Sequence, residues 1–251
     1  MKNRLMSIAD YSLQSLFKKI CKYKYSQLES KDMPIDDFEG DTFVAFIDIS
    51  GFKELMKDEN RTIEALDKFY STGYDILHYK TNLNGIFISD CGIIFIRDNP
   101  DVITSFSELL KAIQEINSKM LGINVMLTSS IAFGGFKYRK KIEFRGIDKN
   151  SLHGGAYLAA YLANEKEEPK MEPGQCRIVT KDLPPEIGKQ FLENRSWCMQ
   201  KQGNKFYNYY WMIKDISQIE EFTNDYQDTY QRKYTGMLSV LRKYNNKRQF
   251  R

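Results

Sequence analysis

Two aspartates stand where short apolar segments end, and these are the residues best placed to do chemistry. Asp48 directly follows the apolar run 43–47. Asp90 lies at the tip of a predicted hairpin, between the apolar runs 86–88 and 93–96. In a β-α-β-β unit the first strand often lies beside the hairpin, so the two carboxylates can meet at one edge of the sheet. Oxygen ligands without histidine or cysteine favour Mg²⁺ or Mn²⁺ over zinc, and two such ions suit phosphoryl chemistry.

A purely structural role stays open for both acids. Aspartates commonly cap helices or occupy turns, so each residue could serve local structure alone. Finding both acids at the ends of apolar strands, in this order, favours the metal interpretation. A separation of about 4–6 Å between the carboxylates would fit a shared two-metal site, and one beyond about 12 Å would exclude it.

The rest of the chain supplies the elements that must position these acids. The apolar spacing predicts, in chain order, a strand at 43–49, a helix through 63–77, a hairpin at 86–96, a helix at 101–120, strands at 124–135 and about 141–147, a helix at 151–164, a strand near 176–180, a short helix near 184–194 and a strand at 206–213. This order indicates an α+β fold with a ferredoxin-like sheet and helices packed on one face. Further helices are predicted at 1–28 and from 217 to about 245.

Composition excludes several classes of protein. The 251 residues carry a net charge of +4, which is too mild for a dedicated nucleic-acid binder, although the basic end RKYNNKRQFR leaves nucleic acid as a minor alternative. The four cysteines are scattered without a CxxC pair, which predicts reduced thiols rather than disulfides or a zinc site. The charged start is unlike a signal peptide, and no apolar run reaches 18 residues, so we expect a cytoplasmic protein without a membrane span.

Three segments resemble the catalytic domains of class III nucleotidyl cyclases. FVAFIDISGF, at 43–52, is similar to the family's first metal motif, FxDIxGF. NGIFISDCGIIFI, at 84–96, is similar to its second, a hairpin with Gly-Asp at the tip, here Ser-Asp. SLHGGAYLAAYLANE, at 151–165, resembles its helix of the form GxxVNxAARL. The resemblance spans about 43–213 and implies a βαββαβ catalytic domain at 41–215, with an extension at 1–40 and a helix with a basic tail at 216–251.

The resemblance implies a site and a reaction. In the family two aspartates bind two divalent ions, Mn²⁺ or Mg²⁺, and these roles fall on Asp48 and Asp90, with the carbonyl of Ile49 as a possible third ligand. Phe52, which ends the first motif, is assigned to substrate binding. The ribose 3′ oxygen attacks the α-phosphate of a nucleoside triphosphate and expels pyrophosphate. Family sites form between two subunits, so one copy of each motif implies a homodimer.

The sequence departs from the family at the residues that read the base. Adenylate cyclases carry a lysine four residues before the second metal aspartate, where this chain has Ile86. When the helix is aligned on Ala159-Ala160, the second base-reading position falls on Asn150. The same alignment puts Tyr157 and Tyr161 at the family's transition-state Asn and Arg. A phenol donates one hydrogen bond but carries no charge, so a charge-assisted contact is lost.

Several cations could replace the missing arginine. Lys201 and Lys205, in MQKQGNKFYNYYWM, resemble the lysine-bearing hairpin that grips the triphosphate. The other candidates are basic residues that precede the predicted helix: Lys137, Arg139, Lys140, Arg145 and Lys149. A solvated surface charge is the alternative interpretation for each lysine.

This sequence keeps the metal aspartates but lacks the purine-reading residues. That combination is similar to one branch of the family, the bacterial anti-phage pyrimidine cyclases of Pycsar systems. That branch implies that UTP or CTP is converted to a cyclic monophosphate, which activates a separate effector protein. Asn150 can present either a donor or an acceptor to the base, and we favour UTP slightly. Three alternatives stay open: a nucleotide-binding module without turnover, a purine cyclase, and a nucleic-acid-binding protein.

Overall fold

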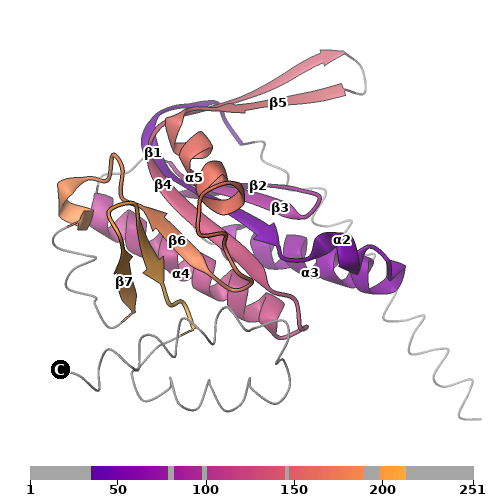
Figure 1. The fold of residues 1–251 in the computed structure, drawn as a ribbon. Coiled ribbons are helices and arrows are strands. Elements are labelled where there is room, and N and C mark those ends of the chain that lie inside the picture. The colour runs from indigo at the N-terminus through magenta and orange to yellow at the C-terminus, as the bar shows by residue number, and fades with distance from the viewer. Residues whose placement is uncertain (1–34, 79–81, 98–100, 145–146, 189–197, 213–251) are drawn as a thin grey trace, which may run out of the picture. The chain divides into compact units, whose positions relative to one another are not determined.

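The core is a mixed sheet with β1 near its middle. This computed structural model describes residues 35–78, 82–97, 101–144, 147–188 and 198–212, with side chains given for these ranges except 140–150. Within them, eight strands form the sheet: β1 (Phe38–Ile49), β2 (Leu83–Ile88), β3 (Cys91–Ile96), β4 (Leu127–Phe144), β5 (Ile147–His153), β6 (Cys176–Val179), β7 (Met199–Gln202) and β8 (Phe206–Tyr209). The strand order is β2-β3-β1-β4-β6-β8-β7, with β5 paired to β4 (Figure 1).

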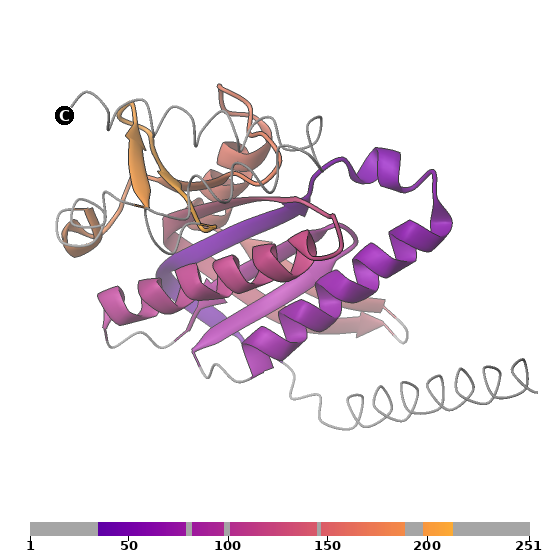
Figure 2. The same cartoon turned by 90° about the horizontal axis from the view of Figure 1, so that it is seen from below.

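Two long helices cover one face of this sheet. They are α3 (Glu59–His78) and α4 (Val102–Leu121), and the short α2 (Phe52–Leu55) precedes them. On β1, Phe43 packs against Phe106 of α4 with ring centroids 4.6 Å apart. Both side chains are fully buried, so the apolar core lies between this face and the helices (Figure 2). No helix among the described residues is both long and apolar enough to cross a membrane.

The helix α5 (Gly155–Glu165) packs on the opposite face. Its Tyr161 contacts Phe46 edge to face, at 5.5 Å between ring centroids. Phe43 and Phe46 are three residues apart on one strand, and side chains alternate between faces, so α4 and α5 must lie on opposite sides. The expectation of helices on one face is therefore right for α3 and α4 and wrong for α5.

The predicted order of elements is confirmed with shifted boundaries, except that α2 and β7 were not predicted. β1 begins at Phe38 rather than Phe43, because it pairs with β4 along its whole length. The strand expected at 141–147 is the end of β4, and β5 occupies 147–153. The helix expected from 151 starts at Gly155 instead. The terminal helices predicted at 1–28 and 217–245, and the second half of the helix near 184–194, lie outside the described residues.

Candidate active site

Asp48 sits at the end of β1 on the face that carries α5. In the sheet it lies opposite Cys91 of β3 on one side and Thr128 of β4 on the other. Its carboxyl group is half-buried. Burial raises the pKa of Asp48 to about 6, the nearby Asp90 and Glu165 add to the rise, and a hydrogen bond from Cys91 opposes it. A carboxylate that is costly to ionise is one that a bound cation would stabilise.

Asp90 is held against the end of β1 by its backbone. Ile88 pairs with Cys91, so the turn contains only Ser89 and Asp90 rather than the four residues expected. The N–H of Ile49 donates to the Asp90 carbonyl at 3.0 Å, and the Tyr70 hydroxyl donates to the Ser89 carbonyl at 2.9 Å. Ser89 adopts a φ of 54°, a conformation that costs a non-glycine residue about 1–2 kcal/mol. The turn is therefore fixed from two sides, which places the Asp90 carboxylate.

The two carboxylates converge with a thiol. One ligand atom each from Asp48, Asp90 and Cys91 lies within 4.8 Å of the others. The Cys91 thiol donates a hydrogen bond to Oδ1 of Asp48 at 3.2 Å. Burial raises the pKa of Cys91 well above its usual value, as do the adjacent carboxylates. The two acids are thus well inside the 12 Å limit beyond which a shared metal site would be excluded.

Sequence reasoning missed three residues around Asp48. Cys91 was read only as a reduced thiol, although a two-residue turn places the residue after Asp90 opposite Asp48. Glu165 ends α5 close enough to raise the pKa of Asp48. Asn164 accepts a hydrogen bond from Thr128 at 2.9 Å, and its buried amide nitrogen has no partner among the described residues. The last two could not be found from sequence, because no pattern showed that α5 covers this face.

The raised pKa of Asp48 gives a prediction for stability. The folded chain holds this proton more tightly than the unfolded chain, whose carboxyl keeps a pKa near 3.8. The resulting stabilisation is complete below about pH 4 and is lost as the pH rises through about 6. Asparagine never ionises, so the stability of the variant does not fall in this way as the pH rises. We expect the Tm of metal-free Asp48→Asn, relative to wild type, to increase across that range in calorimetry with a chelator present.

A matched variant separates this effect from general charge removal. Asp41 is an exposed carboxylate on the same strand, so Asp41→Asn makes the same chemical change away from the site. Its Tm relative to wild type should show no comparable rise. A Tm difference for Asp48→Asn that stays flat with pH would contradict the burial of an ionisable Asp48.

Comparisons with known proteins identify the fold. No protein-family model matches the sequence, and no curated protein matches it. A bacterial light-regulated adenylyl cyclase superimposes with a TM-score of 0.52 and 12% identity, over 84% of this chain and 68% of its own. The chain has the fold of a class III cyclase catalytic core.

Two further solved structures show the same likeness at lower scores. The adenylyl cyclase CyaB from P. aeruginosa has a TM-score of 0.48 and 14% identity, over 70% of this chain and 96% of its own. The guanylate cyclase domain of RhGC from Catenaria anguillulae, in complex with GTP, has a TM-score of 0.49 and 14% identity, over 69% and 96%. At such identities the similarity concerns the fold alone.

In this cyclase fold, both tyrosines of α5 lie on the face of Asp48. Tyr157 and Tyr161 are one helical turn apart and contact Phe46, with ring centroids 6.5 and 5.5 Å away. Phe46 precedes Asp48 by two residues and so points to the same side of β1. Burial raises the pKa of Tyr157, with Cys91 and Tyr161 contributing. The structure therefore brings these phenols beside the acidic pair of their own chain.

Gly154 offers a second way to align α5 with the cyclase helix motif. Its φ is 139°, and an added Cβ would lie 2.2 Å from the Gly135 carbonyl oxygen, so this position requires glycine. Aligning the motif's glycine here moves the register by one. Leu158 and Leu162 then replace Tyr157 and Tyr161 at the Asn and Arg positions. Both alignments leave those positions without an amide or a guanidinium group.

The proposed base-reading residues are placed less completely. Ile86 lies on the edge strand β2, paired with Ile93. Phe52 starts α2 and is buried in the core, so it supports the end of β1 from behind. Asn150 pairs with Lys140 in the β4–β5 ribbon, but its side chain lies outside those described.

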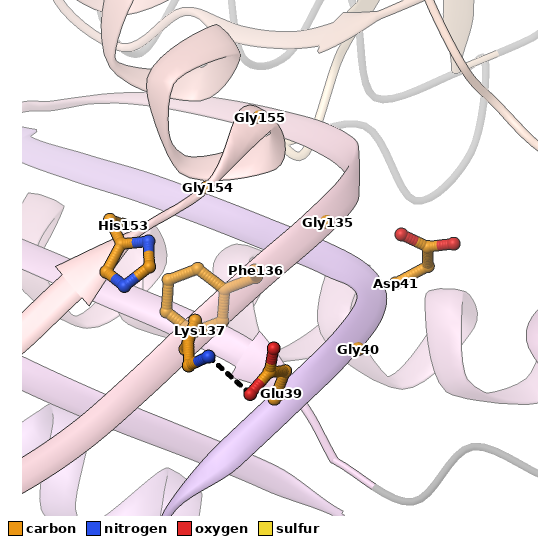
Figure 3. A pocket seen from close by; sticks show the side chains of 9 residues that line it. All are labelled: Glu39, Gly40, Asp41, Gly135, Phe136, Lys137, His153, Gly154 and Gly155. Carbon is orange, nitrogen blue, oxygen red and sulfur yellow. Dashed lines mark ion pairs between the residues drawn. The ribbon is translucent and has the colours of Figure 1, made fainter.

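The candidate cations of β4 do not reach the acidic pair in the same chain. Lys137 and Arg139 bind Glu39 at 2.5 and 3.4 Å. Glu39 lies nine residues before Asp48 on β1, roughly 30 Å away at strand spacing. Figure 3 shows Lys137 beside Glu39 in a cavity of about 420 Å³ at that far end of the strand. The side chains of Lys140, Arg145 and Lys149 are not among those described.

Lys201 and Lys205 also lie away from Asp48. Lys201 is on β7, four strand positions from β1, which corresponds to roughly 19 Å. Lys205 follows the β7–β8 turn and binds Glu167 at 2.8 Å. It borders a cavity of about 500 Å³ between α5 and the end of β6, which Leu158 and Leu162 also line. One chain therefore presents the acidic pair and this lysine pair at separate places.

Proposed function

We propose that the chain is a pyrimidine nucleotide cyclase that converts UTP, with CTP as the less favoured alternative, to the 3′,5′-cyclic monophosphate and pyrophosphate. The observation that carries the proposal is the meeting of the Asp48 and Asp90 carboxylates within 4.8 Å in a class III cyclase fold. The cyclic product would act as a second messenger for anti-phage defence through a separate effector protein. That part rests on the resemblance to Pycsar cyclases.

The acidic pair fits the divalent ions that this chemistry needs. Asp48 and Asp90 would hold Mg²⁺ or Mn²⁺ through carboxylate oxygens, the ligands that these ions prefer, and the Ile49 carbonyl is a further candidate. Two such ions supply neutralisation of the triphosphate and activation of the ribose 3′ oxygen. The raised pKa of Asp48 supports the fit. Ionising this half-buried carboxyl costs free energy, and no cation among the described residues offsets that cost.

The candidate base-reading residues favour a pyrimidine. A purine site needs buried donors and acceptors that match the base, and Ile86 offers neither. On α5, Tyr157 and Tyr161 can each donate one hydrogen bond to a phosphate oxygen. Asn150 pairs with Lys140, near the end of β4 that lies far from Asp48, so it, or Ser151 in the register set by Gly154, would read the smaller base from a partner subunit.

A homodimer would complete the site. Within one chain Lys201 lies four strand positions from β1, and Lys205 is bound to Glu167. A partner subunit could bring its lysines, and the cavity beside Leu158 and Leu162, to the acidic pair of the first. Two equivalent sites would then form at one interface.

The direct test is incubation of the purified full chain with Mn²⁺ and each of ATP, GTP, CTP and UTP. Chromatography of the products should show cyclic UMP, and cyclic CMP instead would keep the pyrimidine cyclase and name CTP as its substrate. Cyclic AMP or cyclic GMP as the main product would overturn the pyrimidine assignment and leave a purine cyclase. Absence of any cyclic product would overturn the proposed activity.

A second candidate function is nucleotide binding without turnover. The observation that favours it is the lack of a charged residue at the two motif positions of α5, in either alignment. This candidate predicts saturable binding of a nucleoside triphosphate, measured by calorimetry, with no product after long incubation. The cyclase predicts binding together with release of pyrophosphate.

A further inference from the structure

The thiol of Cys91 lies next to the carboxylates of Asp48 and Asp90, so a metal ion bound by this pair would also lie close to the sulfur. We propose that Cys91 is a third protein ligand of this centre, so that the centre binds thiophilic divalent cations such as Cd²⁺ and Zn²⁺ in place of Mg²⁺ or Mn²⁺. The proposal deepens the proposed function, because it concerns the same site. A thiophilic cation in this centre would exclude Mg²⁺ or Mn²⁺ and so inhibit the proposed reaction.

The geometry suits one ion shared by three ligands. Bonds of about 2.1 Å to oxygen and 2.3 Å to sulfur at tetrahedral angles place the two ligand atoms about 3.6 Å apart. Sγ of Cys91 and Oδ1 of Asp48 are already 3.2 Å apart. No pair among the three ligand atoms exceeds 4.8 Å. Rotamer adjustments of about 1 Å would therefore close the site.

The elements that carry these ligands are held in place. Asp48 and Cys91 face each other across paired strands, and the Asp90 backbone is bonded to Ile49. The chain thus offers a largely preformed site, which lowers the ordering cost of binding. Because all three side chains are partly exposed, an ion can enter from solvent.

The sulfur ligand determines which divalent cation binds more tightly. Thiolate is a soft ligand that selects zinc-like cations, whereas Mg²⁺ prefers oxygen in octahedral geometry. When the ion binds, one metal–sulfur bond forms and the S–H proton of Cys91 passes to the buffer. Cys176 and Cys198 differ, because both are buried and neither belongs to a metal-binding group among the described residues.

Titration with Cd²⁺ alone tests the proposal, because a cadmium–thiolate bond has its own ultraviolet charge-transfer absorbance. All proteins would carry Cys21→Ser, so that this thiol adds no signal. We expect saturable absorbance in the parent protein and its loss in Cys91→Ser, with Cd²⁺ affinity reduced more than about tenfold. Serine keeps a hydroxyl donor beside Asp48, so Mg²⁺ binding should persist. Equal charge-transfer absorbance in the parent and in Cys91→Ser would overturn the proposal.

Thiol alkylation of the unsubstituted protein gives a readout that does not depend on a folded variant. Mass spectrometry would follow the rate at which iodoacetamide modifies Cys91. Zn²⁺ should slow this rate strongly, and Mg²⁺ at the same occupancy should slow it less. Equal protection by the two ions would show that Cys91 is only a neighbour of the site.

The two proposals fail separately. Cyclic nucleotide formation with no cadmium–thiolate absorbance would retain the proposed function and reject the ligand role of Cys91. Cadmium–thiolate absorbance in a protein that makes no cyclic nucleotide would retain the third ligand and reject the cyclase.

Discussion

The Asp48→Asn variant is expected to form cyclic nucleotide at least about 10²-fold more slowly than wild type, the loss typical of removing one preorganised charge-stabilising group. Asparagine keeps the size of the side chain but removes the charge, and its amide oxygen is a weaker ligand. The initial rate would be measured with Mn²⁺ and the nucleotide that wild type converts. Electron paramagnetic resonance of Mn²⁺ would show weaker ion binding in the same samples.

Asp41→Asn is the matched control for this experiment. Asp41 is exposed on the same strand and lies seven residues before Asp48, roughly 23 Å away. Its variant should keep the wild-type rate and Mn²⁺ affinity. If Asp48→Asn retained both as well, the acidic pair would not be the catalytic centre.

Gly154→Ala is expected to destabilise the fold by more than about 3 kcal/mol. An alanine Cβ would lie 2.2 Å from the Gly135 carbonyl oxygen and 2.7 Å from Cα of Phe136, which are backbone atoms of β4. The φ of 139° adds strain for any side chain. Relief would require α5 and β4 to move apart. Urea unfolding followed by circular dichroism measures the difference in unfolding free energy.

The neighbouring glycine provides the control. At Gly155 an added Cβ meets no atom within 4 Å, and this residue begins α5. Gly155→Ala should therefore be neutral or stabilise the chain by up to about 1 kcal/mol, since alanine loses less entropy in a helix. Similar unfolding midpoints for the two variants would contradict a tight contact at Gly154.

The order of most elements could be predicted because their apolar residues form either a clear period or a continuous run. Strand β1 reads as a continuous apolar run, and both of its faces are indeed covered. The motif around Asp48 and the hairpin around Asp90 predicted where two acids would meet, and the structure places their ligand atoms within 4.8 Å. Their role as metal ligands stays a prediction.

The features that could not be predicted from the sequence depend on three-dimensional packing. The small, weakly amphipathic α5 has no strong apolar stripe, so its pattern did not say which face of the sheet it covers. The start of α5 depends on the close approach of Gly154 to β4, a contact between residues about twenty positions apart. The place of Cys91 depends on the length of a turn, because one residue more would have turned the thiol to the other face.

The central position of β1 has a consequence for synthesis of the protein in the cell. Its partners come late: β3 starts at Cys91, and the pairing with β4 runs to Tyr138. Until the ribosome has released those residues, the apolar strand 43–49 has two open edges, a condition that invites aggregation. Because its contacts span long sequence separations, folding should be slow relative to helical proteins of this size. The segment that ends in Asp48 should therefore also need protection by chaperones during translation.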